Sequence, residues 1–238
     1  MLMISALLAA VLSASALTGP VQVAPLDPLS QPPGNLSCSE PVYLANLKVV
    51  RAPSFKGDTV AFTSARDTQG RLQLSTSVRG IKTPAYPQFL FRPCNSTILP
   101  TGPYAYQEAT SRYYGFLIPN WHRNKCITYA GDLYSSTPAS FVSADCHTAD
   151  TPALASQWWG VDVGFLAGTT THIAGFYGEN PNDGRNGSYH ISVENSGSAQ
   201  VVQAAWGDDE ASWLGYSAGE LHFQIQNSIY RSAAAGPP

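Results

Sequence analysis

Short runs of β-branched and aromatic residues, separated by Gly, Pro, Asn and Asp, make up most of the chain after its apolar beginning. This alternation of strand-forming runs and turn residues is typical of β-sheet proteins, and the 3.6-residue periodicity of an amphipathic helix is hard to find. Strands are predicted over residues 58–64, 71–78 and 88–92. Residues 67–70 (DTQG) lie between the first two runs and are typical of a turn.

The C-terminal part of the chain shows the same pattern. Residues 171–177 and 189–194 flank an Asn-, Pro- and Gly-rich segment at 180–184. This arrangement predicts a hairpin whose loop is longer than a two-residue turn. Residues 221–225 alternate between apolar and polar side chains, which predicts a half-buried strand. We therefore predict an all-β fold.

The N-terminus predicts export from the cell. Residues 1–16 are uncharged and mostly apolar, end in a small-x-small tripeptide, and are soon followed by prolines. These features indicate a cleaved signal peptide at 1–16 and an extended, Pro-rich arm over 17–37. Because no Lys or Arg precedes the apolar run, a membrane anchor is the alternative interpretation.

Other features agree with a secreted, extracellular protein that leaves the membrane after signal cleavage. Asn35, Asn95 and Asn186 each begin an Asn-x-Ser/Thr tripeptide, which is the acceptor for N-glycosylation. Charged residues make up 12% of the chain and the net charge is −3, so no basic surface for nucleic acid is expected. Residues 233–238 are predicted to form a short flexible tail, and the C-terminal SAAAGPP does not resemble the hydrophobic tail of a lipid-anchor signal.

The four cysteines are Cys38, Cys94, Cys126 and Cys146. An even number in an exported chain predicts two disulfides, for which three pairings are possible. We favour the local pairing, Cys38–Cys94 and Cys126–Cys146, which would stabilise the fold by about 4 and about 3 kcal/mol. A zinc site is disfavoured because it needs closely spaced ligand pairs, and the chain has no Cys-x-x-Cys or Cys-x-x-His.

Two pairs of segments resemble each other at similar spacings. Residues 89–96 and 141–148 both read as a strand that ends in Cys, followed by a polar turn. Residues 158–164 and 213–219 both begin with Trp and share two Gly positions. The two spacings, 52 and 55 positions, predict three weak repeats of about fifty residues within a single domain over 38–232.

The central unit resembles a known family. It contains Cys126 and Cys146, 20 positions apart, and then a Gln-x-Trp motif at Gln157 and Trp159. This pattern, concentrated in residues 125–160, is similar to one repeat of the ricin-B-type β-trefoil lectins, including secreted fungal members. In that family a similarly spaced Cys pair crosslinks each repeat, and the Trp of Gln-x-Trp fills the core. The resemblance implies a β-trefoil-like fold and a carbohydrate-binding role.

The chain departs from this family where galactose-binding members bind the sugar. Those members carry an Asp two residues after the first Cys, and this chain has Thr128. They also carry an aromatic platform two residues before the second Cys, and this chain has Ala144. A sugar needs a planar apolar face for stacking and a carboxylate for its hydroxyl groups. The resemblance therefore implies the scaffold more strongly than it implies a sugar pocket at this position.

Three residues of the central unit are candidate ligand contacts. Trp121 lies in the polar stretch 119–124 and is the best candidate for stacking on a sugar or a protein partner, although a Trp packed over its own loop is the alternative. Asn124 and Asp132 are the polar candidates.

One motif suggests an enzyme. Residues 215–219 (GYSAG) match the Gly-x-Ser-x-Gly of esterases, in which a helix follows the Ser, and Asp and His follow later in the chain. After Ser217 there is no Asp, the single His is His222, and the sequence reads as a strand. We therefore interpret the motif as part of the repeat.

The remaining candidates for metal binding and catalysis are weak. The five His residues lack metal-ligand spacing, so no metal or cofactor is expected. A pair of carboxylates for glycoside hydrolysis depends on tertiary distance, which the sequence does not give. We expect a non-catalytic, lectin-like protein that binds a glycan or glycoprotein. The alternatives are a secreted protein-interaction module, such as a protease inhibitor or effector, and a secreted hydrolase.

Overall fold

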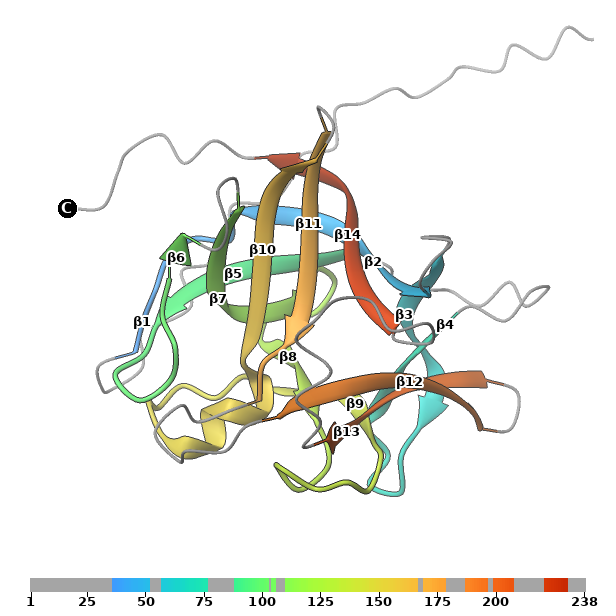
Figure 1. Cartoon of the computed structure of the whole chain (residues 1–238). Helices are drawn as coiled ribbons and strands as arrows, with labels where there is room; N and C mark the ends of the chain where they lie inside the picture. The colour runs from blue at the N-terminus through green and yellow to red at the C-terminus, as the bar shows by residue number, and fades with distance from the viewer. Residues whose placement is uncertain are drawn as a thin grey trace, which may run out of the picture.

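The computed structural model is all-β with one short 3₁₀ helix (Figure 1). It describes residues 36–51, 57–76, 88–102, 104–105, 110–166, 169–178, 187–196, 199–207 and 221–230. The expected signal peptide at 1–16, the arm up to residue 35 and the tail at 233–238 lie outside these residues. The arm was expected to reach residue 37, but Leu36 is buried and Ser37 pairs with Asn95, so both belong to the folded part.

Fourteen strands and the helix follow one another along the described chain. They are β1 (Ser37–Cys38), β2 (Tyr43–Arg51), β3 (Gly57–Arg66), β4 (Leu72–Thr76), β5 (Gln88–Asn95), β6 (Tyr104–Ala105), β7 (Thr110–Pro119), β8 (Lys125–Tyr129), β9 (Ala139–Asp145), η1 (Pro152–Gln157), β10 (Trp159–Leu166), β11 (Thr169–Phe176), β12 (Ser188–Ser196), β13 (Ala199–Gly207) and β14 (Leu221–Tyr230). The strands predicted at 58–64, 71–78, 88–92 and 221–225 correspond to β3, β4, β5 and β14.

The turn between β3 and β4 forms where its residues predict it. One carboxylate oxygen of Asp67 accepts the backbone N–H groups of Gln69 (3.0 Å) and Arg71 (2.8 Å). The same carboxylate accepts the guanidinium Nε–H of Arg71 at 2.7 Å. Gly70 has a φ of 78°, a conformation that a glycine adopts without strain. Asp and Gly therefore fix this turn, and β3 and β4 pair on either side of it.

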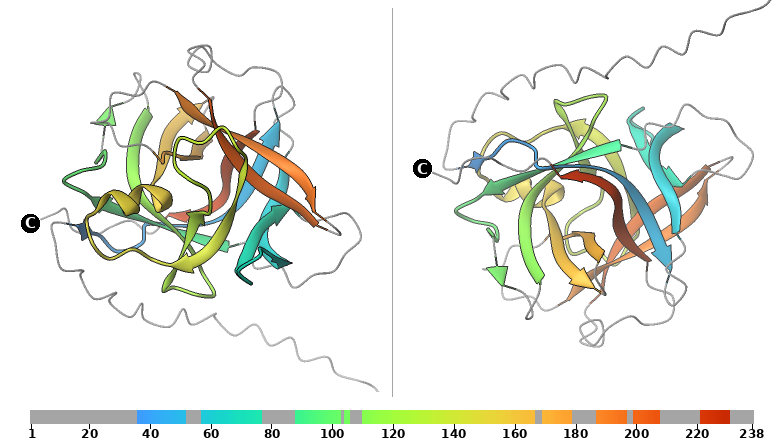
Figure 2. Two further views of the ribbon diagram at one scale, coloured as in Figure 1. Left: turned by 90° about the horizontal axis from the view of Figure 1, so that it is seen from below. Right: turned by 90° about the horizontal axis from the view of Figure 1, so that it is seen from above.

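Six strands form a closed antiparallel ring. Following the pairings around it, β2 pairs with β5, β5 with β7, β7 with β10, β10 with β11, β11 with β14, and β14 again with β2. The pair that closes the ring is β14 with β2, the last and the first of these strands along the chain. Leu221 lies opposite Arg51 at one end of this pairing, and Tyr230 lies opposite Tyr43 at the other. The view from above shows β2, β5, β7, β10 and β14 around a common centre (Figure 2, right).

Three hairpins cover one end of the ring. They are β3–β4, β8–β9 and β12–β13, and each pairs with the other two through β4, β9 and β13. The contacts are short: Gln73 pairs with Val142, Ser140 with Gln203, and Thr76 with Gln200. Figure 1 shows β12 and β13 crossing below the upright strands β10 and β11.

One predicted hairpin is wrong. Residues 171–177 and 189–194 were expected to pair with each other across the segment at 180–184. In the structure β11 pairs with β10 and β14, whereas β12 pairs along its length with β13. The alternation of apolar and polar side chains identifies a strand but not its partner. Here β11 pairs with two other strands of the ring, and β12 pairs with the strand that follows it in the sequence.

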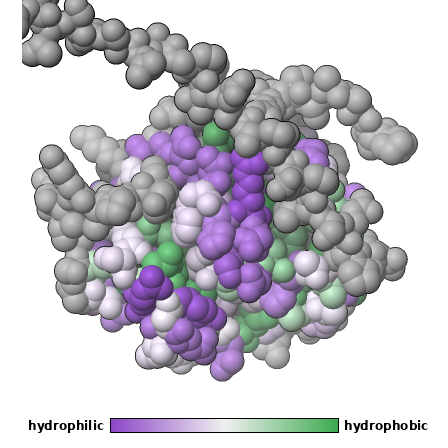
Figure 3. All heavy atoms as spheres, turned by 180° about the vertical axis from the view of Figure 1, so that it is seen from behind, coloured by the Kyte–Doolittle hydropathy of each residue, from purple (hydrophilic) through white to green (hydrophobic). Residues whose placement is uncertain are grey.

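The core has two parts. The first fills the ring and the hairpin end with side chains from alternate positions of the strands, among them Leu47, Phe89, Leu117, Trp159 and Phe176. The second lies between η1 and the end of β5 and includes Cys94, Cys126, Leu154 and Trp158. Much of the described surface seen from behind is polar, with smaller apolar areas between (Figure 3).

Both disulfides are present with the pairing expected from the sequence. Cys38 is joined to Cys94, and Cys126 to Cys146. The first bond ties β1 to β5, and the second joins the start of β8 to the residue that follows β9. Cys94 and Cys126 are almost fully buried in the second part of the core, so each bond reinforces a packed region.

Candidate functional site

Gln157 joins η1 to the β8–β9 hairpin through three hydrogen bonds. Its side chain is fully buried. The amide nitrogen Nε2 donates to the Thr128 hydroxyl and to the Asp145 carbonyl, both at 2.8 Å. The amide oxygen Oε1 accepts the backbone N–H of His147 at 2.7 Å. The Gln of the Gln-x-Trp motif therefore has a structural role.

Trp159 fills the core, as the sequence predicted. It is fully buried, and its indole N–H donates to the Ile127 carbonyl at 3.2 Å. The preceding Trp158 is also fully buried, and its N–H donates to the Pro100 carbonyl at 2.9 Å. The motif thus connects β10 to both parts of the core.

Thr128, which stands where galactose-binding ricin-B-type lectins carry an Asp, serves the fold in this chain. Thr128 is buried, donates its hydroxyl to the Cys126 carbonyl at 3.2 Å and accepts from Gln157. Ala144 lies opposite Cys126 on β9 and has no ring to offer a sugar. A ligand site on this chain must therefore use other side chains.

Replacing Gln157 with alanine is expected to lower the free energy of unfolding by about 2–3 kcal/mol. The change removes the donor to the buried Thr128 hydroxyl and leaves the Asp145 carbonyl and the His147 N–H without the Gln157 side chain as a partner. Urea denaturation followed by circular dichroism would measure the loss. Ser156→Ala is the matched control in the same helix, because Ser156 makes only an exposed bond to Ala153. Equal stability of the Gln157 variant and the wild type would contradict the structural role.

The structure separates the three ligand candidates predicted from the sequence. Trp121 is half-buried in the turn after β7 and packs edge-on against Phe62, with ring centroids 6.5 Å apart. Asn124 is exposed at the start of β8, and Asp132 is exposed beyond its other end. The five residues of β8 span about 17 Å, so Asn124 and Asp132 do not share a site. Trp121 adopts the packed arrangement that was its alternative interpretation.

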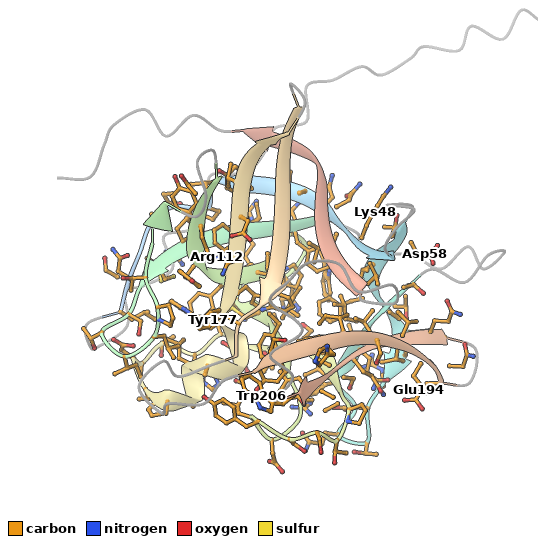
Figure 4. The ribbon with its side chains drawn as sticks, in the orientation of Figure 1. Lys48, Asp58, Arg112, Tyr177, Glu194 and Trp206 are labelled. Atoms are coloured by element: carbon orange, nitrogen blue, oxygen red, sulfur yellow. A yellow bond between two sulfur atoms is a disulfide. The ribbon has the colours of Figure 1, made fainter. Side chains whose placement is uncertain are left out.

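An aromatic column runs from the core to the surface near Asp132. It consists of Phe141, Phe176, Tyr189, Trp206 and Tyr134, with centroid distances of 5.2, 4.7, 5.1 and 5.0 Å between successive rings. All four contacts are edge-to-face, the arrangement that aromatic quadrupoles favour. Phe141 is fully buried, whereas Tyr134 is half-buried at the outer end. Figure 4 labels Trp206, near β13.

The loop that contains Tyr134 has an unusual backbone conformation that is fixed by hydrogen bonds. Tyr134 has a φ of 66°, which is rare for a bulky residue. Its backbone N–H donates to the Tyr189 hydroxyl at 3.0 Å, and the backbone N–H of Trp206 donates to the Ser135 carbonyl at 2.9 Å. A further bond, from the backbone N–H of Ser135 to the backbone carbonyl of Asp132 at 3.2 Å, closes the turn. Such strain persists only where surrounding contacts fix it, and it is concentrated at functional sites.

Two glycines let the column lie directly against the backbone. Gly178 has a φ of 57°, and a Cβ there would lie 2.6 Å from the rings of Phe176 and Tyr189. A Cβ on Gly187 would lie 2.5 Å from the Trp206 ring. Any larger residue at either position would displace these rings, so the two glycines fix the depth at which the column sits.

Asp132 brings an exposed carboxylate to the loop that carries Tyr134. The pKa of the Tyr129 hydroxyl is raised, first by burial and then by the charge of the Asp132 carboxylate. Tyr129 therefore stays protonated, and its hydroxyl donates to the Ala204 carbonyl at 3.2 Å. An exposed carboxylate and a supported aromatic ring thus come from the same short loop, 130–138.

Two other carboxylates are used in ion pairs. Asp162 on β10 accepts two bonds from the Arg112 guanidinium, at 2.5 and 2.7 Å, across the β7–β10 pairing. Hydrogen bonding to Asp162 raises the pKa of Arg112 despite its burial. Asp145 accepts from Lys125 at 2.8 Å between β9 and β8. These charges hold neighbouring strands together. Figure 4 shows that Arg112 lies away from Trp206 and therefore from the aromatic column.

Several sequence-based predictions fall outside the described residues. The Gly-x-Ser-x-Gly segment at 215–219 is one, and the acceptor sites at Asn35 and Asn186 are two more. Within the described ranges, no group of three or more His, Cys, Asp or Glu side chains could hold a metal ion. In the same ranges, no helix has the length and apolar character needed to cross a bilayer.

Sequence reasoning missed Tyr134, Tyr189 and Trp206. They lie far apart along the chain and share no spacing that marks a site. The one local signal is the composition of the loop around Tyr134, which contains Gly131, Asp132 and Pro138. These residues predict turns, but they do not determine where the Tyr134 side chain points.

Comparisons with known proteins add little. No protein-family model matches the chain, and no curated protein matches it. Among solved structures, the SDF2-like protein from Arabidopsis thaliana is similar at a TM-score of 0.42 and 11% identity, over 80% of this chain and 97% of that one. A likeness at this level carries no argument about fold or function.

Proposed function

We propose that this chain is a secreted β-trefoil protein that binds carbohydrate without catalysis, through a surface formed by Tyr134, Asp132 and the supporting Trp206. We refer to this surface as the Tyr134 site. The single observation that carries the proposal is the strained Tyr134, held at the end of an aromatic column, with the exposed Asp132 two residues before it in the same loop.

The strand pairing supports the β-trefoil architecture. Three successive groups of four strands, β2–β5, β7–β10 and β11–β14, each give their first and last strands to the closed ring. Each group gives its two middle strands to one hairpin of the cap. Six ring strands and three mutually paired hairpins are the arrangement expected of a threefold repeat, so the pairing agrees with the weak repeat in the sequence.

Export is supported by two disulfides and by the signal-peptide pattern at residues 1–16. Disulfides form and persist in oxidising compartments and are rare in the cytosol. The described residues contain no free cysteine. A secreted protein is also exposed to extracellular glycans, which are the proposed ligands.

The Tyr134 site has the two groups that a neutral sugar requires. A pyranose presents an apolar face of C–H groups and a rim of hydroxyls, so it binds an aromatic ring together with a hydrogen-bond acceptor. The Tyr134 ring supplies the first and the Asp132 carboxylate the second. Trp206, only 6% exposed, supports the Tyr134 ring from within. Because the loop is already held in one conformation, binding costs little ordering entropy.

Replacing Tyr134 with glycine is expected to reduce carbohydrate binding at least about tenfold, because an aromatic contact is lost. Stability should change by only about 1 kcal/mol, since glycine relieves the left-handed strain while losing the contact with Trp206. Screening the full chain on a glycan array would identify a ligand, and titration calorimetry with that oligosaccharide would compare the variants.

Two further variants separate binding from folding. Tyr134→Phe keeps the ring and should retain most of the affinity, whereas Asp132→Asn should weaken binding without unfolding the chain. Thr137→Ala, at an exposed position of the same loop, is the matched control. Failure of the folded wild type to bind any carbohydrate would refute the proposal. Capture of a protein partner through the same loop would instead favour a protein-interaction module.

A further inference from the structure

The acceptor sequence at residues 95–97 lies at a structured edge of the fold. Asn95 is exposed at the end of β5, where it pairs with Ser37 of β1. The preceding residue, Cys94, is buried and bonded to Cys38. The backbone of Asn95 is therefore held in a strand beside a disulfide.

Asp150 binds the two residues that follow Asn95. One of its carboxylate oxygens accepts the Ser96 hydroxyl at 2.5 Å. The other accepts the backbone N–H of Thr97 at 2.7 Å and its hydroxyl at 2.8 Å. We refer to these three bonds as the Asp150 contact. The Ser96 oxygen in turn accepts the N–H groups of Ile98 and Leu99, so the whole segment is fixed.

The Asp150 contact is a charged one. Partial burial raises the pKa of this carboxyl, and the hydrogen bonds from Ser96 and Thr97 outweigh that effect, so the pKa lies below its ordinary value. Asp150 is therefore ionised near neutral pH, and hydrogen bonds to an ionised group are stronger than neutral ones. The contact keeps the Thr97 hydroxyl occupied in the folded chain.

We propose that Asn95 is modified with an N-linked glycan only before the Asp150 contact forms, so that folding closes this acceptor. The transfer requires a Ser or Thr hydroxyl at the third position of the acceptor. In the folded chain that hydroxyl, at Thr97, donates to Asp150 and is not available to the transferase. The Asn95 side chain itself is exposed, so a glycan added earlier fits the final fold.

The transfer needs a sugar donor of one chemical class, an oligosaccharide linked through pyrophosphate to a lipid. The Asn95 amide nitrogen forms a bond to the anomeric carbon of the first sugar. The bond from that carbon to the pyrophosphate oxygen breaks, the lipid pyrophosphate leaves with the electron pair, and the proton lost by the amide nitrogen is taken up by the released pyrophosphate. The opportunity for this step ends after Asp150, 53 residues beyond Thr97, has been synthesised and has docked.

The direct test uses unglycosylated full-length protein, purified oligosaccharyl transferase and a lipid-linked oligosaccharide. Modification of Asn95, measured by peptide mass spectrometry, is expected to be at least about tenfold slower in the folded protein than in the same protein after reduction and unfolding. Equal rates in the two states would overturn the proposal.

A variant in secreting cells tests the contact itself. Asp150→Ala should raise the occupancy of Asn95, measured against that of a fully exposed reference acceptor added at the C-terminus. Asp67→Ala is the matched control, because it removes a comparable set of bonds from a turn that does not touch the acceptor. Equal increases in both variants would show that general folding speed sets the occupancy and would overturn a specific role for Asp150. No increase in Asp150→Ala would overturn it as well.

Discussion

Replacing Trp159 with alanine is expected to lower the free energy of unfolding by about 4 kcal/mol. Trp159 is fully buried and lies 5.2 Å from the Phe141 ring and 5.3 Å from the Phe176 ring. The substitution leaves a large cavity and also leaves the Ile127 carbonyl without its donor. Since whole domains are stable by only about 5–15 kcal/mol, much of the folded state would be lost on mild heating. Urea denaturation followed by far-ultraviolet circular dichroism would measure the change.

Trp159→Phe is the control for this substitution, because it keeps an aromatic ring in the core and removes the indole N–H. We expect it to cost clearly less than the alanine variant. A loss below about 1 kcal/mol in Trp159→Ala would contradict the central packing role of this residue, because that is the level of an ordinary substitution.

Removing the Cys38–Cys94 disulfide is expected to cost about 4 kcal/mol when both cysteines are replaced by alanine. The bond closes a loop with a sequence separation of 56, so it removes considerable freedom from the unfolded chain. It also ties β1 and β5 together beside the acceptor at Asn95. The measurement is a comparison of urea midpoints for the double variant and the wild type.

The Cys126–Cys146 bond provides an internal comparison. Its separation is only 20, so its removal should cost about 3 kcal/mol, less than removal of the longer crosslink. If the shorter crosslink proved to matter more, the explanation through unfolded-state entropy would be wrong. Native packing around Cys126, which is fully buried, would then be the controlling factor.

The features that the sequence predicted are those determined by neighbouring residues. The turn at 67–70 follows from Asp67 and Gly70, which satisfy its backbone directly. The strands β3, β5 and β14 follow from their runs of β-branched and aromatic residues. The Gln-x-Trp motif correctly predicted a buried Trp159 because its resemblance to a known repeat carried that information.

The partners of the strands could not be read in the same way. The strand at 171–177 was paired with its neighbour in the sequence, whereas β11 pairs with β10 and β14. The alternation of apolar and polar side chains predicts which face of a strand is buried, but it does not predict which strands pair with it. Those neighbours depend on closure of the ring, to which strands from the whole described chain contribute.

The Tyr134 site illustrates the same limit. Asp132 was a candidate from the sequence, but the ring beside it depends on a backbone conformation that Tyr rarely adopts. That conformation is held by Tyr189 and Trp206, which belong to another hairpin. Trp121 was preferred because it stands in a polar stretch, yet its ring packs against Phe62.

The pairing of β14 with β2 has a consequence for synthesis of the chain. The ring cannot close until the last of its strands has left the ribosome, although β2 and β5 are made early. At about 5–20 residues per second, the stretch from β2 to β14 takes roughly 10–40 s to translate. During that interval the edge of β2 that will pair with β14 is exposed, and exposed strand edges readily pair with other chains. The nascent protein is therefore most prone to aggregation, and most in need of chaperones, before its final strand is complete.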